Sequence, residues 1–325
     1  MTDEELMEVA IDAAASVRTS TAPDPWVGAV VQTVAGEVHV GATRASDGAH
    51  AETVALAAAA QSAVGATLVT TLEPCSSTSG SGPCTHSIVD AGIERVVVGV
   101  ADPDARTSGS GIDALRSAGL EVVVGVLEDR VTEQLVPYLH HRRTGRPYVV
   151  AKASMTFDGR TAAPDSSSRW IAGEAARADS HHLRAESQAV VVGAGTVRSD
   201  DPTLTTRFVD GPSPRRVVLG SAPPDAKIQP CLEWRGELDG LLDRLGSEGV
   251  LQVLVEGGSN TITQFHSEGL VDRFVVYIAP ATFGGDDGHP MFVGAGAPTM
   301  DEIQRGRFVD VRRIGDDLRI DLVLD

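Results

Sequence analysis

Four residues in the first part of the chain have the types and the spacing of a catalytic zinc site. His50 and Glu52 lie two positions apart, and Cys75 and Cys84 follow, each directly after a proline. One imidazole and two thiolates can hold zinc in a tetrahedral site whose fourth position stays open for water. Zinc lowers the pKa of that water, and Glu52 is placed to take its proton. The spacing therefore predicts hydrolysis at a zinc centre.

The same residues fit the pattern of zinc deaminases, which is His-x-Glu followed by Pro-Cys-x-x-Cys, with a glutamate that is not a zinc ligand. Here the loop is longer, with eight residues between Cys75 and Cys84. We predict that Glu52 passes its proton to departing ammonia. Two alternatives stay open: a structural zinc ion, and two buried unpaired cysteines beside a histidine that caps a helix.

Local patterns place each of these residues at the end of a helix or strand. Residues 50–63 are alanine-rich and helical in pattern, and the histidine is the first of them. The strand expected at 66–72 leads to Cys75, and Pro83 suits the first turn of the helix that holds Cys84. Unpaired N–H groups and the helix dipole favour thiolates at such a position.

Strand and helix patterns alternate along all 325 residues, which predicts an α/β fold in two domains. In the first half we expect helices at 4–17, 50–63, 83–91 and 112–118, and strands at 27–34, 37–42, 66–72, 95–100 and 121–126. The last two strands are valine-rich and expected to be buried. In the second half we expect strands at 148–154, 189–192, 216–219, 250–256 and 273–279, and helices at 173–185, 238–246 and 261–268.

The polar segment 128–147 is the expected boundary, which gives domains at 1–146 and 147–325. Its basic residues at 140–143 fit a solvated linker, and phosphate binding is the alternative. Further along, glycine-rich segments at 193–196 and 256–260 each follow an apolar strand. They could bind phosphate at a helix start, or be ordinary strand–helix turns.

Composition limits the class of partner. The net charge of −18 and the 4% aromatic content disfavour a nucleic-acid surface, and no apolar run reaches the ~20 residues of a membrane span. Three cysteines make a poor disulfide framework, and the acidic N-terminal segment does not fit a signal peptide. These features predict a cytoplasmic enzyme with a small-molecule substrate, no nucleic acid and no membrane. For Cys231 the default expectation is a free thiol, either packed or exposed.

Short motifs occur in order along nearly the whole chain. In the first half they are Asp24-Pro25-Trp26-Val27-Gly28, His50-Ala51-Glu52, Thr71-Leu72-Glu73-Pro74-Cys75, Pro83-Cys84 and Asp102-Pro103. In the second half they are Phe157-Asp158-Gly159-Arg160, Trp170-Ile171, Leu183-Arg184-Ala185, the run from Gly193 to Leu204, Glu256-Gly257-Gly258 and Leu270-Val271-Asp272. Together they resemble the bifunctional deaminase/reductase family of riboflavin biosynthesis.

The resemblance implies a cytidine-deaminase-like three-layer N-terminal domain and a dihydrofolate-reductase-like C-terminal α/β domain. It implies Zn2+ and NADPH as cofactors. The reactions would be deamination of 2,5-diamino-6-(5-phosphoribosylamino)pyrimidin-4-one and then reduction of the ribosyl side chain to ribityl. A homo-oligomer, either a dimer or a tetramer, is the expected assembly.

By the same resemblance, the residues that contact NADPH are Ser154, Trp170, Thr196, Asp200, Ser221, Gly258, Ser259, Asn260, Thr261, Ile262, Thr263 and Gln264. Those that contact the substrate are Ser168, Arg184, Leu204, Arg207 and Glu256. The guanidinium groups suit a ribose phosphate, although Arg184 could instead cap its helix. Lys152 is the candidate that polarises or protonates the sugar as its ring opens, and a lysine that only reaches toward solvent is the alternative.

Two features depart from the family pattern. The segment 76–82 lacks the paired histidines and the basic residue that the family usually carries, and Asp24 stands where the family usually has asparagine. These departures leave three further hypotheses: a paralogue that acts on a related pyrimidine nucleotide, a reductase with an altered deaminase domain, and a binding protein that keeps only the fold.

Overall fold

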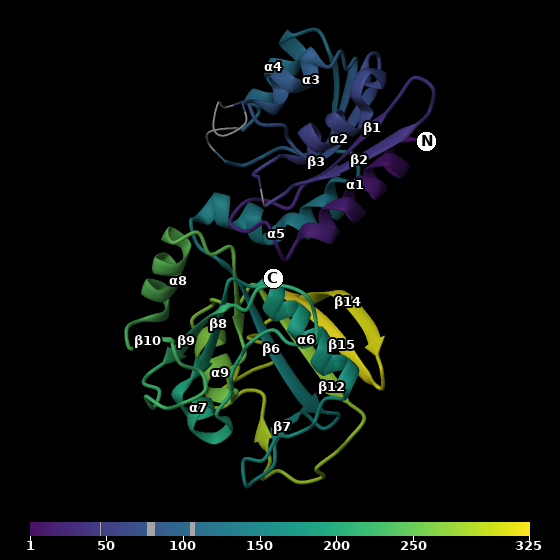
Figure 1. Cartoon of the computed structure of the whole chain (residues 1–325). Coiled ribbons are helices and arrows are strands. Elements are labelled where there is room, and N and C mark those ends of the chain that lie inside the picture. The colour runs from purple at the N-terminus through teal and green to yellow at the C-terminus, as the bar shows by residue number, and fades with distance from the viewer. Residues whose placement is uncertain (46, 77–81, 105–107) are drawn as a thin grey trace. The chain divides into compact units, whose positions relative to one another are not determined.

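The computed structural model describes residues 1–45, 47–76, 82–104 and 108–325 and divides into two compact units, Met1–Gly145 and Arg146–Asp325 (Figure 1). Within the described ranges, no helix has the length and apolar character that crossing a membrane requires.

The first unit is built on a sheet with the strand order β2-β1-β3-β4-β5, antiparallel at β1 and parallel from β3 to β5. Its strands are β1 (Gly28–Gln32), β2 (Val38–Ala42), β3 (Thr67–Leu72), β4 (Arg95–Val100) and β5 (Glu121–Val124). Its helices are α1 (Asp3–Val17), α2 (Ala51–Ala59), α3 (Cys84–Asp90), α4 (Ser110–Ser117) and α5 (Glu128–Thr144), with a 3-10 turn at Ala60–Ala63.

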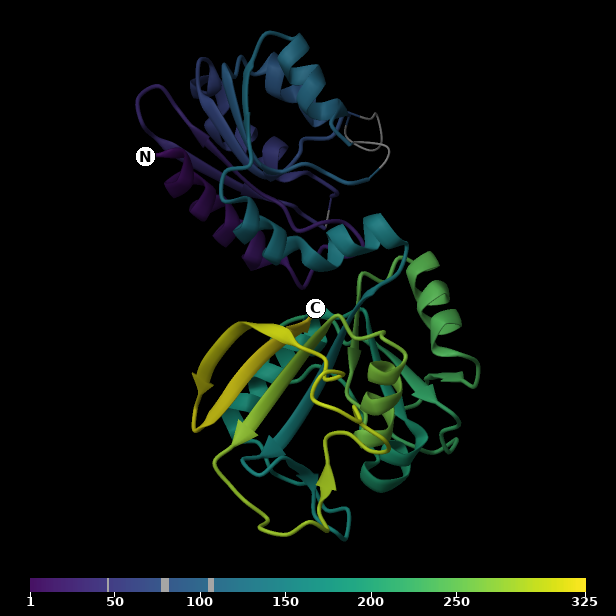
Figure 2. The same ribbon diagram turned by 180° about the vertical axis from the view of Figure 1, so that it is seen from behind.

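Helices cover both faces of this sheet and make three layers. Helices α1 and α5 pack on one face, while α2, α3 and α4 pack on the other (Figures 1 and 2). Helix α2 lies very close to β2, because a Cβ at Gly41 would come within 2.3 Å of the Ala51 carbonyl oxygen. A glycine in β2 therefore sets the position at which α2 begins.

Two expectations for this unit are wrong. Strand β5 is at the edge of the sheet and is partly exposed, with Val124 at 41%, so its valines do not make it a buried strand. The expected linker is instead the helix α5, whose buried residues Val131, Leu135 and Leu139 follow a spacing of four. That spacing puts the three residues on one side of the helix, which packs against the rest of the first unit. Gly145 then ends the helix in a left-handed conformation.

The second unit is built on an eight-stranded sheet, as far as the structure describes it, with the order β10-β9-β8-β11-β6-β12-β15-β14. In this order, neighbouring strands from β10 to β12 run parallel to each other. Strand β15 then pairs antiparallel with β12, and β14 pairs antiparallel with β15. The strands are β6 (Tyr148–Thr156), β8 (Ala189–Gly193), β9 (Arg215–Leu219), β10 (Leu232–Trp234), β11 (Gln252–Val255), β12 (Arg273–Ala279), β14 (Gly306–Ile314) and β15 (Asp317–Leu324). Strands β7 (Arg160–Ala162) and β13 (His289–Pro290) form a separate pair.

The helices of the second unit are α6 (Glu174–Glu186), α7 (Ala194–Asp200), α8 (Leu238–Ser247) and α9 (Ser259–Ser267). All five expected strands and three expected helices of this half are present. The sequence analysis did not anticipate the C-terminal hairpin β14–β15, the short helix α7, or strands β7, β10 and β13. Residues 193–196, expected to be a turn, contain the start of α7.

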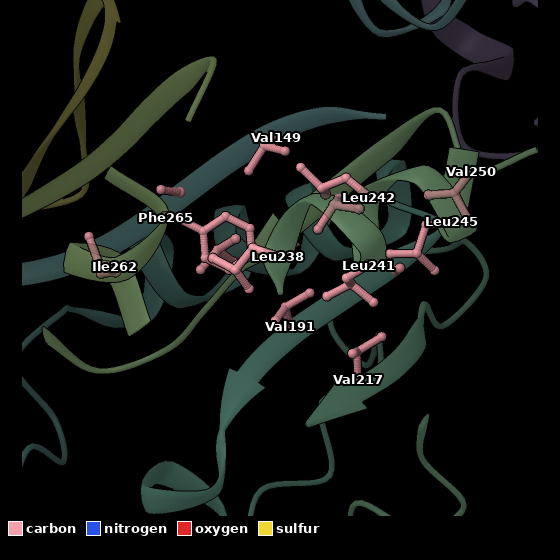
Figure 3. Packing of buried hydrophobic residues seen from close by; sticks show 14 of the residues in the cluster. Val149, Val191, Val217, Leu238, Leu241, Leu242, Leu245, Val250, Ile262 and Phe265 are labelled. Atoms are coloured by element: carbon pink, nitrogen blue, oxygen red, sulfur yellow. The ribbon is translucent and has the colours of Figure 1, made fainter. Parts of the chain in front are cut away.

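Both faces of the large sheet are buried. One face buries an apolar cluster under α8 and α9, in which Leu238, Leu241 and Leu245 pack together (Figure 3). Strand β6 contributes Val149, Ala151 and Ala153 to this cluster, and the alternation of side chains along a strand sends Lys152 to the opposite face. That face also carries buried apolar residues, Val150 and Val192 among them, so Lys152 is a charged group in a largely apolar layer.

Candidate active sites

Three donor atoms converge in the first unit. The distances are 3.1 Å from His50 Nδ1 to Cys84 Sγ, 3.5 Å from the same nitrogen to Cys75 Sγ, and 3.3 Å between the two sulfurs. In a tetrahedral zinc site such donors lie roughly 3.5 to 3.8 Å apart, as bond lengths of ~2.0 to 2.3 Å require. Two of the three distances are a few tenths of an ångström shorter than this, so the donor set fits zinc once the side chains move slightly apart.

The ends of a strand and two helices bring these donors together, as the sequence predicts. His50 is the N-cap residue of α2, and Cys75 follows β3. Cys84 is the first residue of α3, and Pro83 occupies the N-cap one position earlier than expected. The Cys84 backbone N–H donates to Cys75 Sγ over 3.4 Å. The start of α3 therefore stabilises negative charge on the other ligand.

Hydrogen bonds among the two cysteines and the histidine set where the protons of these three donors lie. The hydrogen bond between the two sulfurs lowers the pKa of Cys75 and raises the pKa of Cys84, so the pair shares one negative charge. The hydrogen bond to Cys75 raises the pKa of His50 to about 9. A divalent cation would replace the protons on Cys84 and His50, because both bind metal only when deprotonated.

Glu52 lies in the first turn of α2 beside these donors and is 4% exposed. Burial raises the pKa of its carboxyl group to about 7. A group with a pKa near the working pH can both accept and donate a proton in one catalytic cycle. Glu52 is therefore suited to the proton transfer that the sequence assigns to it.

Glu73, two residues before Cys75, is a buried carboxylate that the sequence analysis gave no role. It accepts backbone N–H bonds from Asp102 and Gly109 over 3.1 and 3.0 Å, and from Gly111 and Ile112 over 2.9 and 3.2 Å. These bonds tie the end of β3 to the loop after β4 and to the start of α4. Glu73 thus holds the segment that carries Cys75.

Two of the short motifs of the first half, Asp24–Gly28 and Asp102-Pro103, contain residues with structural contacts. Trp26 is 2% exposed, and its Nε1 donates to the Gln134 carbonyl over 3.1 Å. The Asp102 carboxylate accepts the Tyr138 hydroxyl over 3.0 Å and the Asp104 N–H over 2.9 Å. Residues 77–81, most of the loop that departs from the family pattern, lie outside the described residues.

The second unit contains a cavity of about 1200 Å3, lined by residues of β6, α6 and the start of α9 among others. Most of the predicted reductase residues line it: Lys152, Ser154, Ser168, Trp170, Arg184, Thr196, Asp200, Leu204, Arg207, Glu256, Gly258, Ser259, Asn260, Thr261, Ile262 and Gln264. Two do not. The Ser221 hydroxyl accepts a bond from Arg235, and the Thr263 hydroxyl accepts the Val293 N–H over 2.9 Å.

A buried ionic cluster lies in the wall of this cavity. Glu256 has a side chain only 6% exposed, and both of its oxygens accept from Arg184, at 2.5 Å from Nε and 2.9 Å from Nη2. The Lys152 ammonium lies 3.8 Å from the same carboxylate. Strand pairing explains this contact, because Val255 is opposite Ala151 and the next residues are Glu256 and Lys152.

The cluster fixes the charge of its members. Burial alone would raise the pKa of Glu256, but Arg184 and Lys152 outweigh it and lower that pKa to about 2. Burial lowers the pKa of Lys152, and Glu256 opposes this shift. Arg184 does not cap its helix: besides Glu256, its Nη1 donates to the Thr205 carbonyl over 3.3 Å. Most N–H donors of the Arg184 guanidinium group are therefore already engaged in bonds within the protein.

The start of α9 offers a place for a phosphate group. Gly258 is its N-cap, no side chain caps the helix, and its first two residues, Ser259 and Asn260, line the cavity. A Cβ at Gly257 would meet Thr261 Cβ at 2.3 Å, so the chain needs glycine to turn this closely. Free N–H groups at a helix start suit the pyrophosphate of a dinucleotide.

The cavity also has cationic and imidazole groups that the sequence analysis did not select. They are Arg169, Arg177, His181, Arg198, Lys227 and His289. Arg177 lies over the ring of Trp170, with its guanidinium carbon 4.7 Å from the ring centre. His181 could have been suspected from its position one helical turn before Arg184.

Comparison with known proteins identifies the family. Residues 147–320 match the RibD C-terminal domain, and residues 1–100 match the cytidine and deoxycytidylate deaminase zinc-binding region. The riboflavin biosynthesis protein RibD of Mycobacterium tuberculosis is 38% identical over 342 residues, which cover 98% of this chain and 97% of that protein. The chain belongs to the RibD family.

Solved structures of RibD proteins agree along the whole length. Acinetobacter baumannii RibD matches with a TM-score of 0.92 and 33% identity over 99% of both chains. The diaminohydroxyphosphoribosylaminopyrimidine deaminase/5-amino-6-(5-phosphoribosylamino)uracil reductase of Thermotoga maritima matches with a TM-score of 0.88 and 29% identity, again over 99% of both. These matches confirm the expected family and fold class. They also confirm an enzyme with a deaminase and a reductase domain and with zinc and NADPH as cofactors.

The ionic cluster of this RibD family member leads to a stability prediction. Replacing Glu256 by glutamine leaves Arg184 and Lys152 without their counter-charge, and we expect a loss of about 3 kcal/mol in the free energy of unfolding at pH 7. Because the pKa of Glu256 is lowered, its contribution is complete above its ordinary pKa of 4.5 and is lost as the pH falls toward about 2. The difference between wild type and Glu256→Gln should therefore shrink below about pH 4.5.

Urea denaturation at several pH values measures this difference. Glu248→Gln is the matched control, because Glu248 also pairs with two arginines, Arg215 and Arg244, but is 38% exposed. We expect that control to cost less than about 1 kcal/mol. Equal losses for the two variants would contradict the buried-charge interpretation.

Proposed function

We propose that this chain catalyses two successive steps of riboflavin biosynthesis. The first is zinc-dependent deamination of 2,5-diamino-6-(5-phosphoribosylamino)pyrimidin-4-one, by residues 1–146. The second is NADPH-dependent reduction of the ribosyl side chain to ribityl, by residues 147–325. One observation carries the proposal: a complete set of zinc donors with a buried glutamate and a large cavity with a lysine–glutamate–arginine cluster occur in the same chain.

In the deaminase domain His50, Cys75 and Cys84 would hold zinc, which supplies Lewis-acid activation of water at neutral pH. Glu52 takes a proton from the attacking water at its carboxylate. The water oxygen forms a bond to the ring carbon that carries the amino group. Glu52 then delivers the proton to the amino nitrogen, so that the carbon–nitrogen bond breaks and ammonia leaves. A pKa near 7 suits both transfers.

In the reductase domain the start of α9 and the cavity wall would hold NADPH, which supplies the hydride that reduces the sugar C1′. Opening of the ribose ring leaves the ring oxygen in need of a proton. The Lys152 ammonium faces the cavity and can supply that proton. Burial lowers the pKa of Lys152, which makes it a better acid than an exposed lysine, while Glu256 keeps it charged.

Substrate binding is assigned to Ser168, Leu204, Arg207 and the Arg184–Glu256 pair. Because Arg184 already donates to Glu256, we assign the phosphate mainly to Arg207, with Arg184 holding Glu256 in place. The role of Ser221 and Thr263 in binding NADPH stays a prediction without support from the cavity.

The serine-rich segment 76–82 favours a second candidate function. It lacks the paired histidines and basic residue usual in the family, and Asp24 stands in place of asparagine. A first domain with these changes could deaminate a related pyrimidine nucleotide while the reductase keeps its substrate.

We further propose a cytoplasmic location and a homo-dimer or homo-tetramer. Exposed apolar side chains on β14 and β15, Phe308 at 67% and Val311 at 56% among them, support self-association.

Two variants separate metal binding from proton transfer in the first domain. We expect Cys84→Ser to lose bound zinc and ammonia release together, because a hydroxyl replaces a thiolate ligand. Glu52→Gln should keep one zinc per chain and lose at least about a hundredfold in ammonia release, the usual contribution of a general acid–base. Metal analysis and an ammonia assay on the same samples check both. A Glu52→Gln enzyme with full ammonia release would contradict the assigned role.

Lys152→Ala tests the acid in the second domain. We expect single-turnover reduction of the deaminated nucleotide to slow by about a hundredfold or more, since a positioned acid is lost, while NADPH still binds. Stopped-flow absorbance of NADPH measures the rate, and fluorescence titration measures its binding. An unchanged single-turnover rate would remove Lys152 from the mechanism.

A further inference from the structure

His181 is a buried imidazole in the cavity wall that none of the roles above uses. It lies on α6 and is 4% exposed. Its Nδ1 accepts the backbone N–H of Arg207 over 3.0 Å. Its ring stands edge-on to Phe208, with ring centres 4.7 Å apart. The imidazole therefore connects α6 to the segment that carries two of the proposed substrate residues.

The surroundings keep this imidazole neutral. Burial lowers the pKa of His181 to about 4, and the positive charges of Arg184, Arg207 and Lys152 act in the same direction, while Glu256 opposes them. A neutral ring that accepts at Nδ1 carries its proton on Nε2. Nε2 lies 3.4 Å from Arg184 Nη1, and two donors cannot bond to each other. The Arg207 N–H is thus the partner that fixes the ring.

The segment 203–208 needs such an external anchor. Leu204 has a φ of 51°, a left-handed conformation that is unfavourable for a leucine. The Arg207 guanidinium folds back on the segment, with contacts to the hydroxyl of Thr203 and, at 3.2 Å, to that of Thr205. Two side chains of α6 bond to this segment: Arg184 Nη1 donates to the Thr205 carbonyl, and His181 Nδ1 accepts the Arg207 N–H.

We propose that His181 is a positioning residue for the reductase substrate. Its Nδ1 holds the Arg207 backbone and so keeps the Arg207 guanidinium at the cavity wall, where it meets the anionic group of the substrate. The proposal rests on the proposed function, because it assumes that a phosphorylated ribosylaminopyrimidine is reduced in this cavity.

A pair of amide variants separates the two ring nitrogens. In His181→Asn the amide oxygen can take the place of Nδ1 and accept the backbone N–H of Arg207. In His181→Gln the amide lies nearer the position of Nε2, so the backbone N–H of Arg207 loses its acceptor. We expect His181→Asn to keep a KM for the deaminated nucleotide within about twofold of wild type. His181→Gln should raise that KM roughly five- to tenfold, which corresponds to one lost hydrogen bond, without change in kcat or in the KM for NADPH.

A double-mutant cycle shows whether the effect passes through Arg207. In the Arg207→Ala background, His181→Gln should raise KM by less than about twofold further, because the side chain that it positions is gone. Ammonia release by the first domain of each variant serves as the folding control. Wild-type enzyme that oxidises NADPH only with the deaminated nucleotide establishes the proposed function independently.

Three results would overturn the proposal in an enzyme whose wild type is active. One is an equal KM for His181→Gln and wild type. Another is an equal rise in KM for the asparagine and glutamine variants. The third is a His181→Gln effect that stays five- to tenfold in the Arg207→Ala background.

Discussion

The buried carboxylate of Glu256 is the constraint on which the second unit depends. A charge so little exposed is stable only with close counter-charges, and Arg184 from α6 and Lys152 from β6 supply them. This requirement brings one residue of α6 and one residue of β6 to the same carboxylate. It also gives α6 a fixed place over the sheet, and the substrate cavity lies beside it.

In the first unit, backbone N–H groups rather than side-chain cations stabilise negative charge. Negative charge on Cys75 faces the N–H of Cys84 at the start of α3, and the Glu73 carboxylate faces four further N–H groups. Parallel strands and helix starts therefore stabilise the anionic groups of this unit before any metal binds. In the first unit the zinc donors lie where a strand ends and helices begin, as is usual in α/β sheets, whereas Lys152 of the second unit lies within β6 and contacts Glu256 just after the end of β11.

The zinc site was predictable because its chemistry is local: ligand types, prolines and helix starts are visible in the sequence. Helix α5 was missed because charged residues and Pro137 hide the spacing of Val131, Leu135 and Leu139. The hairpin β14–β15 was missed because β14 is a largely exposed edge strand without alternation. The partner of Arg184 is 72 residues away and that of His181 is 26 residues away, so neither contact has a local signal.

The most direct test of the account is a two-channel assay on one enzyme. Zinc-loaded protein receives the diaminopyrimidinone ribosylamino 5′-phosphate, and ammonia release and NADPH absorbance are followed separately. The account predicts that ammonia appears first and that NADPH is then consumed in a one-to-one ratio to it, with ammonia still released when NADPH is left out. NADPH consumption without prior ammonia release, or no reaction in either channel, would contradict it.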